Sequence, residues 1–492
     1  MESKVTKSLR EAIENAGLEN GMTISFHHHL RNGDHIINMV LDEIERMGIG
    51  DLTVNATALF DVHLPLVDHI KKGTVSHLLT DYVSKGIGTH ISQGEFPSIV
   101  EFRTHGGRPD DIERGKTPID VSFAAASASD IYGNATGKIG KSACGSLGYP
   151  MDEVNYAKKV IVITDTLIQG NLLEYVDAVD VDAVDNANNN KKKFEPSIKS
   201  ESVDFVVEVP EIGDPKGIVS GTTKITEDPM GLFMAETAVK VIESSGLLRN
   251  GFSFQTGAGG ASLATSKYLK EIMLRDNIQG SFALGGITSH MVDMLNAGLF
   301  EELLDVQCFD LGAANSIRIN PRHREISASQ YASAIHQSAH VNKLDVVILG
   351  ATEIDTKFNV NVHTDSMGNL MGGAGGHSDA SAGAKITMII APLFRRNHPI
   401  VLDDVAYVTT PGKDIDVLVT QAGVAVNTSL DKNLELEKRL KAAGINVKSI
   451  FDLREEAVRE TGNREKFIPG EKPVAKIIYR DGSEPSTIYG VK

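Results

Sequence analysis

The segment Leu248-Arg-Asn-Gly251, followed directly by the apolar run Phe252 to Gln255, points to the architecture, because the chain contains this pattern twice. The earlier copy is Leu18-Glu-Asn-Gly21, and it precedes the apolar run Met22 to Phe26. Similarity between segments of one chain is the sequence signature of a duplicated structural unit. One pair of tetrapeptides is weak evidence, so the segments that follow must also match.

Three more pairs of matching segments occur in the same order in both parts of the chain. They are Val67-Asp68 with Val292-Asp293, Asp120-Val121 with Asp345-Val346, and Ala157-Lys158 with Ala384-Lys385. The spacing between partners changes by only a few residues from one pair to the next, which chance matches would rarely do. We therefore predict two copies of one domain, residues 1–227 and 228–492, joined near Thr226 to Met230.

Each copy is predicted to be an α/β domain with a mainly parallel sheet. Short apolar runs alternate with amphipathic helical patterns such as Ser8 to Ala16 and Gly231 to Ser244, which is the arrangement of βαβ units. Strands that are covered on both faces are continuously apolar. In the second copy, the candidate strands of this kind are Phe252–Gln255, Gly280–Ala283, Val346–Leu349, Ile386–Ile390 and Val417–Thr420.

Two segments depart from this alternation. The segment Asn171 to Ser202 contains a polar, low-complexity core, Asn186 to Lys193, and is predicted to be a surface insertion. The C-terminal tail from Leu434 to Lys492 is rich in charge, and we predict that it is a helical extension of the second domain.

Composition and charge exclude several classes of protein. A chain of 492 residues with 41% apolar residues can form two cores. The net charge of −16 argues against a nucleic-acid or anionic-membrane surface, and no apolar run approaches the roughly 18 residues that span a bilayer.

The two cysteines, Cys144 and Cys308, have no metal-type spacing and indicate a reducing compartment. The charged N-terminus is no signal peptide, so we expect a cytoplasmic protein.

Two glycine-rich segments follow strands of the second copy, where open α/β sheets bind ligands. Gly257-Ala-Gly-Gly260 follows the first strand and precedes a helix, and Met371-Gly-Gly-Ala-Gly-Gly376 follows an extended segment. Glycine turns and helix N-termini offer unpaired backbone N–H groups to a ligand. Turn geometry is the alternative explanation for each cluster.

The two copies differ at a position that bears on catalysis. Glu353, just after the strand Val346–Leu349, aligns with Ala128 of the first copy. A carboxylate at the carboxyl end of a strand in one copy only indicates that the second domain carries the chemistry. The alternative is a solvated loop glutamate.

The segment Arg103-Thr-His-Gly-Gly-Arg108 places two arginines on either side of a glycine pair. Guanidinium groups hold carboxylates through paired hydrogen bonds, so this segment is a candidate clamp for an acidic substrate. An ordinary loop with surface arginines is the alternative.

No metal site and no nucleotide-binding P-loop is predicted. The residues His27-His-His29 are neighbours along a strand and alternate between its faces, whereas zinc needs three or four converging ligands. Gly137-Lys-Ile-Gly-Lys-Ser142 resembles a phosphate loop, but the first glycine of that motif falls on Ala135.

Several motifs together resemble the citrate lyase alpha subunits, which are related to CoA-transferases. The motifs are Thr23 to His29 with Arg31-Asn-Gly-Asp34, Arg103 to Arg108, Cys144 to Tyr149, Gly213 to Ile218, Gly257 to Gly260, Met371 to His377 and Asp403 to Val408. The resemblance extends from about residue 8 to residue 470. It implies a tandem repeat of two CoA-transferase-like domains, in agreement with the repeat in the sequence.

The resemblance also implies a reaction and partners. Citrate would replace acetate on the thioester of an acyl carrier protein, and a lyase (beta) subunit would then cleave the citryl thioester. The carrier (gamma) subunit would supply a dephospho-CoA-type prosthetic arm, so no cofactor is expected to be covalently bound to this chain. An oligomeric complex is expected.

The position of Glu353 is that of the nucleophilic glutamate of related CoA-transferases, which forms an anhydride and then an enzyme thioester. In the citrate class, a carboxylate of citrate would attack instead, and Glu353 would orient or polarise it. The sequence leaves both roles open. Backbone N–H groups of Gly373, Gly375 and Gly376 would stabilise the oxyanion.

The remaining candidates would bind the substrates. Arg103, His105 and Arg108 would bind citrate from the first domain, across the cleft between the domains. The residues that would bind the cofactor arm are Gly257, Ala258, Gly259 and Gly260.

Two other functions stay open. One is a CoA-transferase or hydrolase that acts on free acyl-CoA, with Glu353 as the nucleophile. The other is a non-catalytic sugar-phosphate sensor, which would carry a helix-turn-helix and a phosphate loop, and the sequence shows neither.

Overall fold

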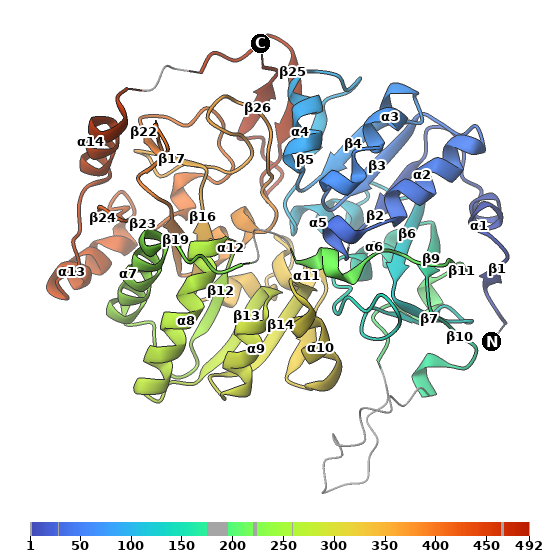
Figure 1. Ribbon diagram of the computed structural model, residues 1–492, viewed down its shortest axis with the longest axis horizontal. Coiled ribbons are helices and arrows are strands. Elements are labelled where there is room, and N and C mark those ends of the chain that lie inside the picture. Colours follow the sequence, from blue (N-terminus) through green and yellow to red (C-terminus); the bar gives the residue numbers. More distant parts are fainter. Residues whose placement is uncertain are drawn as a thin grey trace, which may run out of the picture.

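The computed structural model describes residues 2–27, 29–174, 195–219, 224–257, 259–463 and 467–491. Two large sheets lie side by side, one formed mainly by the blue-to-teal part of the chain and the other by the green-to-orange part (Figure 1). The architecture is mixed α/β with mainly parallel sheets, as predicted. Among the described residues, no helix combines the length and the apolar character that crossing a bilayer requires.

The first sheet has ten strands, and every neighbouring pair is parallel except the last. In spatial order they are β1 (Val5–Thr6), β11 (Phe205–Glu208), β9 (Lys159–Thr164), β6 (Val121–Ala126), β2 (Thr23–Phe26), β3 (Leu52–Ala56), β4 (Val75–Thr80), β5 (Val100–Phe102), β25 (Pro473–Ile477) and β26 (Ser486–Tyr489).

The second sheet has eight strands, and only its last pair is antiparallel. In spatial order they are β15 (His323–Glu325), β14 (Phe300–Cys308), β13 (Gly280–Ile287), β12 (Ser253–Thr256), β16 (Val346–Gly350), β19 (Ile386–Ile390), β23 (Val417–Thr420) and β24 (Gly423–Val426). All five strands predicted for this half are present. β13 runs beyond the predicted end at Ala283, because the apolar segment continues through a bulge between Gly285 and Gly286.

Helices pack against both sheets. In the first half they are α1 (Leu9–Ala16), α2 (Ile36–Arg46), α3 (Leu66–Lys71), α4 (Lys85–Ser92), α5 (Gly107–Glu113) and α6 (Pro150–Tyr156). In the rest of the chain they are α7 (Pro229–Ser245), α8 (Gly260–Arg275), α9 (Ser289–Asn296), α10 (Leu311–Ile319), α11 (Ala328–Ala332), α12 (His377–Gly383), α13 (Leu434–Ala442) and α14 (Ile450–Thr461).

The order of strands is alike in the two sheets. The first sheet contains the series β11-β9-β6-β2-β3-β4, and the second contains β23-β19-β16-β12-β13-β14. After β6 and after β16, the chain forms a small three-stranded sheet: β10 (Leu167–Ile168), β7 (Ala128–Asp130) and β8 (Ala135–Thr136) in one case, and β18 (Val360–Asn361), β17 (Glu353–Asp355) and β22 (Val401–Leu402) in the other. A short hairpin of β20 (Phe394–Arg395) and β21 (His398–Pro399) follows in the second half.

A turn after each small strand is also alike in atomic detail. Asp130 Oδ1 accepts hydrogen bonds of 2.9 Å from the backbone N–H groups of Tyr132 and Asn134. Asp355 Oδ1 accepts bonds of the same length from the residues two and four positions further on, Lys357 and Asn359. The aligned positions of the sequence therefore have equivalent local structures.

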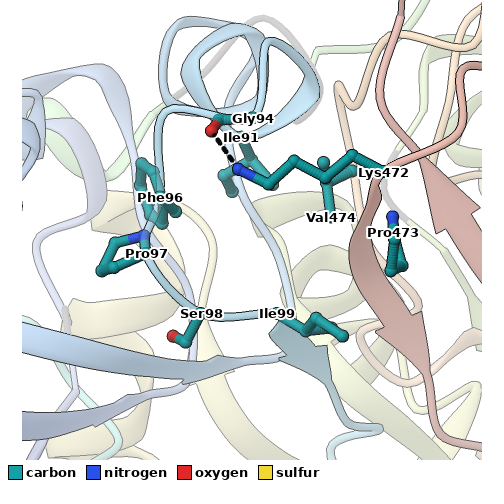
Figure 2. A pocket seen from close by; sticks show the side chains of 9 residues that line it. All are labelled: Ile91, Gly94, Phe96, Pro97, Ser98, Ile99, Lys472, Pro473 and Val474. Atoms are coloured by element: carbon teal, nitrogen blue, oxygen red, sulfur yellow. Dashed lines mark hydrogen bonds between the residues drawn. The ribbon is translucent and has the colours of Figure 1, made fainter.

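The C-terminal tail differs from the predicted helical extension. Its first part forms α13 and α14, but residues 473–489 return to the first sheet as the hairpin β25–β26, and β25 pairs with β5. The reason is that Val474, Ala475 and Ile477 are apolar and become buried, a pattern that the charged residues around them obscure. Where the hairpin meets the first half, it borders a small pocket of about 200 Å³, which Figure 2 shows with Lys472 donating to the Gly94 carbonyl oxygen.

Two other predictions concern the junction between the two halves and the low-complexity insertion. The predicted junction near Thr226 to Met230 coincides with the start of α7, whose first turn is capped by the Asp228 side chain. The low-complexity core Asn186 to Lys193 lies outside the described residues.

Buried carboxylates connect the two halves. Asp379, in α12, accepts hydrogen bonds from Thr104 Oγ1 at 2.8 Å and from the Gly106 N–H at 2.9 Å. In the other direction, Asp110 in α5 accepts from Ser333 Oγ and from the Ala334 N–H. Each half thus supplies acceptors for the other, which fixes the loop Arg103–Arg108 against the second half.

Asp379 should make the stability of the protein depend on pH. Burial raises the pKa of its carboxyl from 3.8 to about 6. Because the folded-state pKa lies above the unfolded one, the contribution of Asp379 is complete below about pH 4 and is lost as the pH rises through about 6. Asn at this position stays neutral, so the free energy of unfolding of the native protein, relative to Asp379→Asn, should fall by on the order of 2 kcal/mol over that interval.

Urea unfolding of both proteins at about pH 4 and about pH 7 measures this difference. The control is Asp403→Asn, whose side chain is 68% exposed and which should show no such change. A difference between native protein and Asp379→Asn that is the same at both pH values would contradict the prediction.

Candidate active site

A hydrogen-bonded network joins the two halves at the carboxyl ends of their strands. His105, in the loop after β5, donates its backbone N–H to the Gly375 carbonyl oxygen at 2.9 Å, and Gly375 donates to the Asp81 carbonyl oxygen at 3.3 Å. The Asp81 carboxylate also lies 2.9 Å from His105 Nδ1. Asp81 is fully buried, and burial raises the pKa of its carboxyl. His105 is therefore held by both its backbone and its side chain against the second glycine-rich segment.

The ring of Tyr149 packs against His105 and connects it to two further histidines. The Tyr149 ring centroid lies 4.7 Å from that of His105 and 4.6 Å from that of His27, whose ring is in turn 4.3 Å from His29. Burial lowers the pKa of His29 to about 3, so this ring is neutral at neutral pH. Within the described ranges, no three His, Cys, Asp or Glu side chains are grouped so that they could hold a metal ion.

Arg31 is a buried cation that interacts electrostatically with Tyr149. Its guanidinium carbon lies 4.9 Å from the centroid of Phe60 and 5.1 Å from that of Phe309, so one aromatic face comes from each half. Arg31 has a φ of 53°, a conformation that few non-glycine residues adopt. Burial lowers the pKa of the guanidinium, and the nearby Tyr82 and Tyr149 side chains oppose this shift.

The two arginines of the predicted clamp are engaged within the first half. Arg108 is 3% exposed and donates to Asn55 Oδ1 at 2.8 Å and to the buried carboxylate of Glu153. Arg103 donates to Glu101 at 2.7 Å and lies 3.3 Å from Asp111. Of the three predicted substrate-binding residues, only His105 has its side chain within the network at the junction.

The glycines predicted to hold an oxyanion lie at the junction. A Cβ atom at Gly373 would be 2.1 Å from the Asp81 carbonyl oxygen, and one at Gly376 would be 2.3 Å from the Tyr331 hydroxyl, so close packing requires glycine at both positions. The N–H of Gly375 donates a hydrogen bond to the Asp81 carbonyl oxygen. Those of Gly373 and Gly376 donate to no residue that the structure describes, and they are the ones left for a ligand.

Glu353 lies beyond the carboxyl end of β16, a strand that contacts Gly257 of the first glycine-rich segment and His377, which follows the second. Gly257 donates to the Ile348 carbonyl oxygen at 2.7 Å on one side of this strand, and His377 Nε2 lies 3.0 Å from the Gly350 carbonyl oxygen on the other. Glu353 begins β17 three residues later, is 2% exposed, and accepts a hydrogen bond of 3.1 Å from Asn361 Nδ2. It is a buried carboxylate and not a solvated loop residue.

The first glycine-rich segment leads into α8. Gly259 precedes this helix with a φ of 143°, and the Gly260 carbonyl oxygen accepts a hydrogen bond of 3.1 Å from the Thr226 N–H. Ala258 lies outside the described residues. The segment that joins the two halves thus packs directly on the predicted cofactor-binding loop.

Three residues of the junction have no role in the sequence prediction: Arg31, Asp81 and Tyr149. Arg31 and Tyr149 lie in motifs that carry the family resemblance, but nothing in their spacing shows that they meet. Asp81 directly follows β4, so the rule that ligands bind at the carboxyl ends of strands could have found it.

Comparison with known proteins gives a consistent answer over the whole chain. Residues 2–491 match the family described as citrate lyase, alpha subunit. The citrate lyase alpha chains of Haemophilus influenzae and Klebsiella pneumoniae are each 43% identical over 489 residues, which is 99% of this chain and 93% and 92% of theirs.

Solved structures agree. The alpha subunit of citrate lyase from Streptococcus mutans, in complex with citrate, has a TM-score of 0.92 and 42% identity, and the match covers 100% of this chain and 92% of that one. The alpha subunit of a malonate decarboxylase from Acinetobacter baumannii has a TM-score of 0.64 at 16% identity, over 94% of this chain and 93% of that one, and so shares the fold. This chain belongs to the citrate lyase alpha subunit family, the acyl-transferase component of that enzyme complex.

Proposed function

We propose that this chain replaces the acetyl group on an acyl carrier protein thioester with a citryl group and releases acetate. The observation that carries the proposal is the junction of Arg31, His105 and Gly373–Gly376, because it combines a buried cation with backbone N–H donors at strand ends. Thioester exchange needs donors for the oxyanion, and a tricarboxylate needs a fixed positive charge. The Streptococcus mutans relative was solved with citrate, which supports a citrate site in this chain too.

In this proposal the two halves, residues 1–227 and 228–492, are two copies of one CoA-transferase-like domain. The hairpin β25–β26 belongs to the second half of the chain but pairs with the first sheet. The matching strand orders and the equivalent turns at Asp130 and Asp355 support the duplication. The first residue of β7 is Ala128 and that of β17 is Glu353. Only the second copy therefore has a carboxylate at this position, and the acyl-transfer centre belongs to it.

The reaction requires partners that carry the acyl group onward. The carrier (gamma) subunit would present its dephospho-CoA-type arm to the start of α8, a helix of 16 residues that begins at Gly260 and is preceded by Gly259. A lyase (beta) subunit would then cleave the citryl thioester. The name of the relatives, citrate lyase alpha chain, supports an assembly with other chains. Two free, buried cysteines fit a cytoplasmic location.

Glu353 is proposed to orient citrate while a carboxylate of citrate attacks the thioester directly. Its carboxylate is buried and is already held by Asn361. A carboxylate that is fixed in this way is suited to positioning a substrate.

Mass spectrometry distinguishes the two roles of Glu353. With direct attack, incubation of the protein with acetyl-carrier alone should leave the mass of the protein unchanged, and Glu353→Gln should retain a rate about 10²–10⁴-fold below that of the native protein. The exposed Glu301→Gln is the matched control and should act as the native protein does. A stoichiometric acyl or thioester adduct on Glu353 would show instead that the residue is the nucleophile.

Arg31 is proposed to bind a citrate carboxylate, with Arg103 and Arg108 supporting the loop around it. Arg31→Met should raise the citrate concentration for half-maximal rate by about 30-fold, the equivalent of roughly 2 kcal/mol for a charged hydrogen bond. Steady-state rates at varied citrate and constant acetyl-carrier measure this effect. Arg46→Met, in an exposed part of α2, is the control.

Arg108→Met should behave differently. It leaves the fully buried Glu153 carboxylate without its cation, so we expect a loss of about 3–5 kcal/mol in the free energy of unfolding and little change in half-saturation by citrate. Urea unfolding and the citrate titration decide between the two arginines. A large rise in the citrate concentration for half-maximal rate in Arg108→Met or Arg103→Met, with none in Arg31→Met, would show instead that Arg103 and Arg108 bind citrate.

A further inference from the structure

His105 has the surroundings of a proton carrier. Its Nδ1 lies 2.9 Å from the carboxylate of Asp81, which is fully buried. A carboxylate in this position orients the ring by accepting a hydrogen bond from Nδ1. The other nitrogen, Nε2, makes no hydrogen bond to any residue in the described ranges, and the side chain is 20% exposed. The Nδ1 edge of the ring is therefore fixed by Asp81, and the Nε2 edge is available to a substrate.

The available edge faces the glycine-rich segment of the second half. A Cβ atom at Gly375 would lie 3.2 Å from His105 Nε2, so this nitrogen is directed at the backbone there. The N–H groups that are left for an oxyanion, those of Gly373 and Gly376, belong to the same segment. A thioester carbonyl held by these groups would have its sulfur within the reach of a ring that can donate a proton.

The other candidates for proton transfer are less suited. His377 has both ring nitrogens engaged, with Thr410 Oγ1 at 2.8 Å and the Gly350 carbonyl oxygen at 3.0 Å. Burial raises the pKa of the Tyr149 and Tyr331 hydroxyls, which makes them weak acids. Glu353 is held by Asn361. His105 is thus the group at this junction that combines access with a positioning carboxylate.

We propose that His105, positioned by Asp81, gives a proton to the sulfur of the carrier arm as the acetyl thioester is cleaved and takes it back as the citryl thioester forms. This inference rests on the proposed function. A carboxylate oxygen of citrate attacks the acetyl carbonyl carbon, the C–S bond breaks, and the sulfur takes the Nε2 proton. The products of this step are a mixed acetyl–citryl anhydride and a thiol.

The second step returns the proton. Nε2 takes the proton of the thiol while the sulfur attacks the citryl carbonyl carbon of the anhydride. The bond between this carbon and the bridging oxygen breaks, and acetate leaves with the electron pair. His105 ends in the protonation state in which it began, so the exchange needs no further acid, base or redox partner.

The chemistry gives a specific expectation about the leaving group. An alkyl thiol has a pKa near 8.5, so its thiolate leaves slowly at about pH 7 unless it is protonated. An aromatic thiol that carries a nitro group is much more acidic and leaves without help. A residue whose task is to protonate the sulfur should therefore matter for the first kind of thioester and not for the second.

The test compares citrate-dependent acetate release from two donors, S-acetyl-N-acetylcysteamine and the acetyl ester of 4-nitrothiophenol, by the native full-length protein and by His105→Gln. We expect the rate of the variant to be about 10²–10⁴-fold lower than that of the native protein with the alkyl donor, and less than about tenfold lower with the aromatic donor. Asp81→Asn should show the same selectivity with a smaller loss. His90→Gln, a partly exposed histidine of α4, is the matched control and should show neither effect.

An equal loss of rate with both donors, or no loss with either, would overturn the role of His105. Addition of imidazole to His105→Ala gives a second measurement, and restored release from the alkyl donor alone supports the proposal, whereas the absence of any effect in the folded variant argues against it. Failure of the native protein to convert acetyl-carrier and citrate into citryl-carrier and acetate would be a failure of the proposed function itself. The two failures are therefore distinguishable.

Discussion

The backbone contact between the two halves at Gly375 is the constraint on which the rest of the junction depends. Its carbonyl oxygen accepts from His105 and its N–H donates to Asp81, so one residue of the second half fixes two loops of the first. Side chains would not fit here, since a Cβ atom at the neighbouring Gly373 would overlap the Asp81 carbonyl oxygen. The glycine-rich segment is therefore required both by the packing of the halves and by the backbone donors that it presents.

The proposed duplication offers an explanation of how a single junction becomes asymmetric. Parallel strands place their carboxyl ends at one edge of each sheet. Where these edges of two sheets meet, the loops that follow the strands of each sheet come together. Each set can then specialise. The first half supplies Arg31, Asp81 and His105, whereas the second supplies the glycine-rich segment and Glu353, whose counterpart in the first half is Ala128. Chemistry that needs both sets requires both halves.

The parts of the structure that depend on local pattern could be predicted, and those that depend on pairing between distant residues could not. Val346–Leu349 and Ile386–Ile390 are continuously apolar, and both became strands that are buried on both faces. The hairpin β25–β26 was missed because its partner strand β5 lies far away in the sequence, and the surrounding charged residues give the tail a helical appearance. The clamp of Arg103 and Arg108 rested on residue type alone, which does not reveal that Arg108 pairs with Glu153, 45 positions further along the chain.

The three arginines show why the location of a charge matters more than its presence in a motif. A buried cation is tolerated when a carboxylate pairs with it, and Arg108 meets this condition through Glu153. Such a pair is already neutral, so drawing the cation towards a substrate would leave Glu153 buried and unpaired. Arg31, by contrast, lies between the faces of Phe60 and Phe309, which come from different halves of the chain. A substrate carboxylate that binds between the halves would therefore meet Arg31, whereas drawing on Arg108 would break the buried pair of Arg108 with Glu153.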